Sequence, residues 1–72
     1  MIEQKHALRG GIKGFRPGAL FHLSGGQVWK QVSAEYVAQF LFRPQATLYL
    51  TPDDAELKVE GLEGRVKVRR IK

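Results

Sequence analysis

The sequence predicts an all-β fold, a small partly open barrel of five or six antiparallel strands of the SH3-like or OB-like kind. Two observations carry this prediction. Several short segments alternate apolar and polar residues with a period of two, which is typical of half-buried strands. Glycine, proline and aspartate stand between these segments, where tight turns require them. With 72 residues, the chain is expected to form one domain over residues 1–72, with a modest core.

The first fifteen residues give two expectations. Residues 1–8 are either a first strand or a frayed arm. Residues 10–15 carry three glycines, which indicate a bend, a bulge or a close approach between strands. A phosphate-binding loop is disfavoured here because no Gly-Lys-Ser or Gly-Lys-Thr follows. The next residues, Arg-Pro-Gly at 16–18, predict a turn.

The clearest local pattern is a hairpin over residues 21–32, turning at Ser-Gly-Gly in positions 24–26. Before the turn, Phe21 and Leu23 share one face. After it, Trp29 shares a face with Gln27 and Gln31. Two interpretations of the tryptophan stay open: a core residue, or an exposed platform with amide arms that stacks bases or binds peptides.

Residues 33–42 fit either a short helix, which would make the fold α+β, or a strand. The strand is favoured because aromatic and β-branched residues recur and three aromatic residues fall on one face. It would gather Tyr36, Ala38, Phe40 and Phe42 on one face.

The last third of the chain reads as three strands. Leu48 and Leu50 alternate with polar residues over 46–51, and a Pro-Asp-Asp turn then leads to inward positions at 55, 57 and 59. After a glycine-flanked turn at 61–64, Val66 and Val68 mark a final strand. Because Ile71 falls out of phase, either a bulge near residues 69–70 restores it to the core or the strand ends at Arg69.

The amino-acid composition excludes several kinds of chemistry. The chain has no cysteine, which excludes disulfides and thiolate chemistry, and its two histidines lack the spacing of a zinc site. No nucleophile has an evident base, so we expect no enzyme, metal site or cofactor. The segment around residues 36–42 is too short to span a bilayer and no signal peptide is visible, so we expect a cytoplasmic protein without a membrane role.

Charge suggests what the protein binds. The net charge is +5, but residues 53–64 hold five acidic side chains against one basic, and residues 65–72 hold five basic side chains. Two function classes follow. The first is nucleic-acid binding by a basic C-terminal strand; the second is a protein-interaction or homodimerising module with an aromatic surface. The candidate site residues are Trp29, Lys30, Gln31, Tyr36, Phe40, Arg65, Lys67, Arg69 and Arg70.

Several of these segments occur together in one family. The Gly-Gln-Val-Trp-Lys-Gln of residues 26–31, the aromatic run at 36–42 and the Val-Lys-Val-Arg-Arg of residues 66–70 resemble small bacterial domains. Those domains carry an Asn-Gly-Gln-Val-Trp-x-Gln hairpin and end in Val-x-Val-Arg-Arg; here Gly25 stands in place of the asparagine. Their aromatic run is richer in tyrosine than residues 36–42. The resemblance implies a domain of its own over about residues 10–71, and it brings no activity, ligand or catalytic residue.

Overall fold

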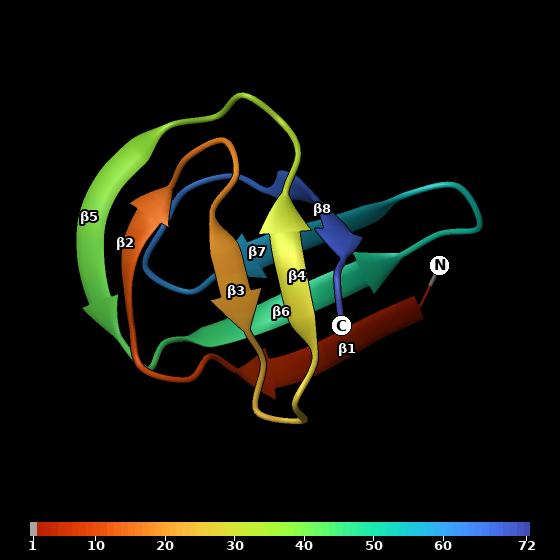
Figure 1. Ribbon diagram of the computed structural model, residues 1–72, viewed down its shortest axis with the longest axis horizontal. Coiled ribbons are helices and arrows are strands. Elements are labelled where there is room, and N and C mark those ends of the chain that lie inside the picture. The colour runs from red at the N-terminus through yellow and green to blue at the C-terminus, as the bar shows by residue number, and fades with distance from the viewer. Residues whose placement is uncertain (1) are drawn as a thin grey trace.

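The computed structural model describes residues 2–72, and over these residues the chain forms eight strands and no helix (Figure 1). The all-β prediction is confirmed, and the helix considered for residues 33–42 is absent. The strands are β1 (Ile2–Ala7), β2 (Gly11–Phe15), β3 (Leu20–His22), β4 (Val28–Gln31), β5 (Val37–Phe42), β6 (Gln45–Leu50), β7 (Ala55–Val59) and β8 (Val66–Arg70).

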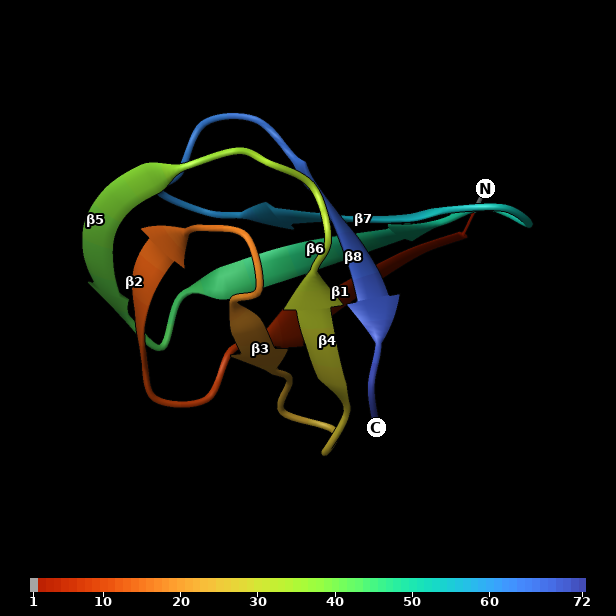
Figure 2. The same cartoon turned by 45° about the horizontal axis from the view of Figure 1, so that its top comes forward.

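Six of the strands form one antiparallel sheet in the order β1-β6-β7-β8-β4-β3. The sheet curls until its two outer strands meet at one end, where Leu8 and Leu23 form an isolated bridge. Two backbone hydrogen bonds flank this bridge, from Arg9 N to His22 O (2.8 Å) and from Ser24 N to Ala7 O (2.8 Å). The result is a partly open barrel. In Figure 2, β3 and β4 run across the direction of β1 and β6.

One hydrophobic cluster fills the barrel. The inward faces of the hairpin 21–32 and of the last three strands supply most of it, as the alternation predicts. Phe15 and Phe21 pack edge to face, with ring centroids 6.2 Å apart and planes at 73°. The buried apolar residues are Leu8, Ile12, Phe15, Phe21, Leu23, Trp29, Ala46, Leu48, Leu57, Val59, Leu62, Val66 and Val68.

The glycine-rich segment at residues 10–15 is more than a bend. It forms β2, which pairs with β5 as a separate two-stranded sheet at the left of Figure 1. The register shifts between Ile12 and Gly14, where one residue of β2 faces two of β5, so the expected bulge is present. A side chain at Gly14 would overlap the carbonyl oxygen of Val37, which explains why glycine is needed there. With β2 included, the strands number eight rather than five or six.

The chain ends settle two further alternatives. Residues 2–7 form β1, which pairs with β6 along its whole length, so the strand interpretation holds there; Met1 lies outside the described residues. At the other end, β8 runs to Arg70, one residue past the predicted end at Arg69, and Ile71 is 55 % exposed, so no bulge restores it to the core. No helix in residues 2–72 is long and apolar enough to cross a membrane.

Candidate nucleic-acid interface

Trp29 belongs to the core, so the exposed platform predicted as one alternative is wrong. Its side chain is 7 % exposed and lies opposite Phe21 in the β3–β4 register. The indole Nε1 donates a hydrogen bond to Gln27 Oε1 at 3.0 Å. A core this small needs its largest side chain, and the neighbouring amide satisfies the one polar atom of the ring. No base can stack on Trp29 in this fold.

Gln31 was also expected to contact a ligand, but it is 1 % exposed. Its Oε1 accepts a hydrogen bond from Arg16 N (2.9 Å), and its Nε2 donates to Ser33 O (3.0 Å) and Glu35 O (2.8 Å). These bonds tie the β2–β3 turn to the segment that enters β5. Gln31 therefore positions the surface around it and does not itself reach solvent.

The predicted cations separate into two groups. Lys30 on β4 lies directly opposite Arg69 on β8, and both side chains are exposed on the outer face of the barrel. Neither forms an ion pair within residues 2–72. Like charges directly opposite each other destabilise a sheet. This pair is therefore a natural place for a bound anion.

The other predicted cations are partly neutralised. Arg65 lies 3.6 Å from Glu56 and its guanidinium covers the Tyr49 ring, 3.8 Å from the centroid. Lys67 faces Glu56 across β7 and β8. Arg70 donates to Lys72 O (3.2 Å), and both Arg70 and Arg69 line a shallow hollow that also contains Asp53 and Asp54.

Lys67 has a second acidic neighbour in Glu35. Hydrogen bonds from the Ser33 hydroxyl and from the backbone amide of Glu35 lower the pKa of this carboxyl below its ordinary value, and the Lys67 ammonium adds to the effect. The charge of Lys67 is thus more compensated than the charges of Lys30 and Arg69.

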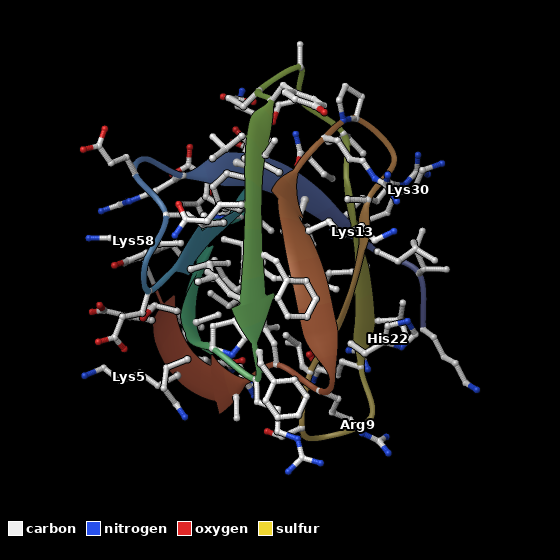
Figure 3. All side chains as sticks on the ribbon, turned by 90° about the vertical axis from the view of Figure 1, so that its left-hand side faces the viewer. Lys5, Arg9, Lys13, His22, Lys30 and Lys58 are labelled. Carbon is white, nitrogen blue, oxygen red and sulfur yellow. The ribbon has the colours of Figure 1, made fainter. Side chains whose placement is uncertain are left out.

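The three-dimensional arrangement adds cations that were not singled out in the sequence. Lys13 of β2 and Leu20 of β3 line one hollow, and Leu20 lies opposite Lys30. Lys13, Lys30 and Arg69 thus form a basic belt across β2, β4 and β8. Figure 3 shows Lys30, Lys13, His22 and Arg9 along one side of the barrel, with Lys5 and Lys58 on the other. A sequence signal existed: between residues 4 and 52 the only acidic residue is Glu35.

Beside the basic belt, Tyr36, which directly precedes β5, and Phe40 and Phe42 on β5 form an aromatic row. These side chains are 71 %, 66 % and 68 % exposed, which confirms that the aromatic face of this segment is uncovered. Phe40 lies over the backbone of β2, where a Cβ at Gly11 would come within 2.6 Å of its ring. Among the described strands, β5 pairs only with β2, so its other edge is open.

In residues 2–72 no three histidine or acidic side chains gather in a group that could hold a metal ion. No protein-family model, curated protein or solved structure matches the chain. The basic belt and the aromatic row are the features of the surface that point to a function.

Proposed function

We propose that this protein is a small non-enzymatic binding module that takes up single-stranded nucleic acid on the side formed by β2, β4, β5 and β8. The single observation that carries the proposal is the Lys30–Arg69 pair, two exposed cations in direct register, neither of which forms an ion pair in the described residues. A phosphate bound between them would relieve their mutual repulsion and gain two charge-assisted hydrogen bonds.

The aromatic row supports a single strand over a duplex. Exposed rings stack on the faces of unpaired bases, and this contact tolerates any sequence. In a duplex the bases are stacked on one another, so their faces are covered and exposed rings cannot stack on them. A single strand could place its phosphates on the basic belt and stack its bases on Phe40 and Phe42 of the aromatic row.

Salt dependence provides the test. We expect a fluorescently labelled 20-nucleotide mixed-sequence DNA strand to bind more tightly than its duplex in an anisotropy titration. If the three cations of the basic belt each contact a phosphate, the slope of log K against log salt should be roughly −2. Charge reversal by Lys30→Glu with Arg69→Glu should abolish binding. Phe42→Ala should weaken binding by about 1–3 kcal/mol.

A matched control separates the site from net charge. Lys5→Glu with Lys58→Glu makes the same change in charge on the opposite side of the barrel (Figure 3) and should retain most of the affinity. Equal losses in the two double variants would contradict a localised site. The absence of any binding at low salt would contradict the function.

A second candidate, a self-associating interaction module, is favoured by the exposure of the aromatic row. Three rings that are each 66 % or more exposed, on or next to an open-edged strand, are unusual for a monomer. Light scattering at micromolar concentration should then give a dimer, and Phe42→Ser should shift it to monomer. Leu20→Ser, at another exposed apolar side chain, should leave the dimer intact. A monomer of 8.1 kDa for the unmodified protein would refute this candidate.

A further inference from the structure

We infer that the hollow at the Leu8–Leu23 end of the barrel is a phosphate-binding subsite, which we name the arginine hollow. It is an open concavity of about 800 Å³, and its polar lining includes Arg9, His22, Ser24, Arg43 and Gln45. This inference deepens the proposed function, on which it rests for the nucleotide to which the phosphate belongs. None of the residues assigned from the sequence lies in it.

The hollow is built where three separate segments are fastened together by backbone hydrogen bonds. Arg9 N donates to His22 O (2.8 Å), which joins the loop after β1 to β3. Arg43 N donates to Gly10 O (2.9 Å), which joins the β5–β6 loop to the same place. The backbones of Arg9, His22 and Arg43 are therefore fixed relative to one another, and binding a small anion would require only side-chain movement.

The charged residues that line the hollow are all basic. Two arginines, a histidine, a serine and a glutamine are among the residues that line it, and no aspartate or glutamate is. A neighbouring hollow of about 510 Å³ differs, because Glu3 and Glu60 balance Lys5 and Lys58 there. Guanidinium groups match the geometry of phosphate oxygens and keep their charge at any physiological pH. The composition of the arginine hollow therefore selects a phosphate group.

Arg43 links this hollow to the aromatic row. Its guanidinium carbon lies 5.3 Å from the centroid of the Phe42 ring, so the cation and the ring are neighbours. Its backbone has φ = 49°, the only left-handed non-glycine residue among those described, and it precedes Pro44. That conformation is costly for a residue with a side chain, and such strain tends to be retained where it serves a site. A nucleotide with its phosphate on Arg43 could lay its base on Phe42.

The test uses small probes and amide signals of ¹⁵N-labelled protein. Titration with thymidine 5′-phosphate should shift the amides of Gly10, Ser24 and Arg43, whereas thymidine without phosphate should not. Inorganic phosphate should shift the same amides but bind more weakly, because it lacks the base. Phe42→Ala should remove that difference. Arg9→Gln and Arg43→Gln should each weaken thymidine 5′-phosphate about tenfold or more.

Controls keep the result specific. Lys58→Gln removes one positive charge beside Glu60 and should change the affinity less than about twofold. Spectral dispersion identical to that of the unmodified protein verifies that each variant folds. Inorganic phosphate binding as tightly as thymidine 5′-phosphate would overturn the assignment to a nucleotide, and unmoved Gly10, Ser24 and Arg43 amides would overturn the subsite.

The inference and the proposed function can fail separately. If the 20-nucleotide strand binds through Lys30 and Arg69 while thymidine 5′-phosphate leaves the hollow unshifted, the function stands and the subsite is refuted. If thymidine 5′-phosphate shifts the hollow while no oligonucleotide binds, the subsite stands as a mononucleotide site and the proposed function is refuted.

Discussion

Both polar atoms of the Gln31 side-chain amide form hydrogen bonds inside the protein. It holds one backbone nitrogen and two carbonyl oxygens that come from different segments of the chain. Each of these groups would otherwise need water, and the side chain that serves them is 1 % exposed. The entry of β5, and with it the aromatic row, depends on this one residue.

Replacing Gln31 by leucine should therefore lower the free energy of unfolding by about 3 kcal/mol or more, because three polar groups lose their partner while the volume of the side chain is nearly kept. Urea unfolding followed by Trp29 fluorescence measures the change. Gln39→Leu, at an exposed position of β5, should cost less than about 0.5 kcal/mol. Similar losses for both variants would show that Gln31 has no such structural role.

Sequence patterns left the roles of Trp29 and Gln31 open for a physical reason. Gln27 and Gln31 flank Trp29, and amide side chains are typical of a solvent-exposed surface. Period-two alternation assigns residues to a face of the strand but does not say which face is buried. In the structure the amides are used internally: Gln27 serves Trp29, and Gln31 serves the backbone. Partners fifteen residues away, such as Arg16, cannot be read from local spacing.

At the scale of elements, β2 is the strand that the pattern missed. Three of the residues at 10–15 are glycines, so no alternation of side chains marks it as a strand. Two of them lack side chains because β5 occupies the space: the ring of Phe40 lies at Gly11, and the carbonyl of Val37 lies at Gly14. The close contact between β2 and β5 positions the aromatic row beside Lys13.

Gly14→Ala should consequently destabilise the fold by about 3 kcal/mol or more, since the added methyl group meets backbone and the residue has φ = 97°. Gly25→Ala is the matched control, because no atom lies within 4 Å of its added Cβ and its φ is outside the left-handed region. It should change stability by less than about 1 kcal/mol. Thermal unfolding of the two variants measures the difference, and equal melting temperatures would contradict a close contact between β2 and β5.

At the scale of the whole molecule, the sequence predicted the fold class and most inward faces, but only part of the interface. Arg69 could be assigned to an exposed position of the last strand from its alternation with Val68. That it faces Lys30, whereas Lys67 faces Glu56, depends on β8 lying between β4 and β7. This order joins segments far apart in the chain, and no local pattern specifies it.

The strand order also determines when the barrel can form during synthesis. β1 is the first described strand to leave the ribosome, yet its neighbour β6 begins at Gln45, and the β3–β4 hairpin must wait for β8, which begins at Val66. Only the β6–β7 and β7–β8 connections are local on that side of the sheet. Bringing such distant strands together lowers the conformational entropy of the chain before their contacts can stabilise the fold. Barrels of this kind therefore fold slowly for their size. Because β8 is the strand that joins β4 to β7, the sheet cannot be completed until β8 has been made.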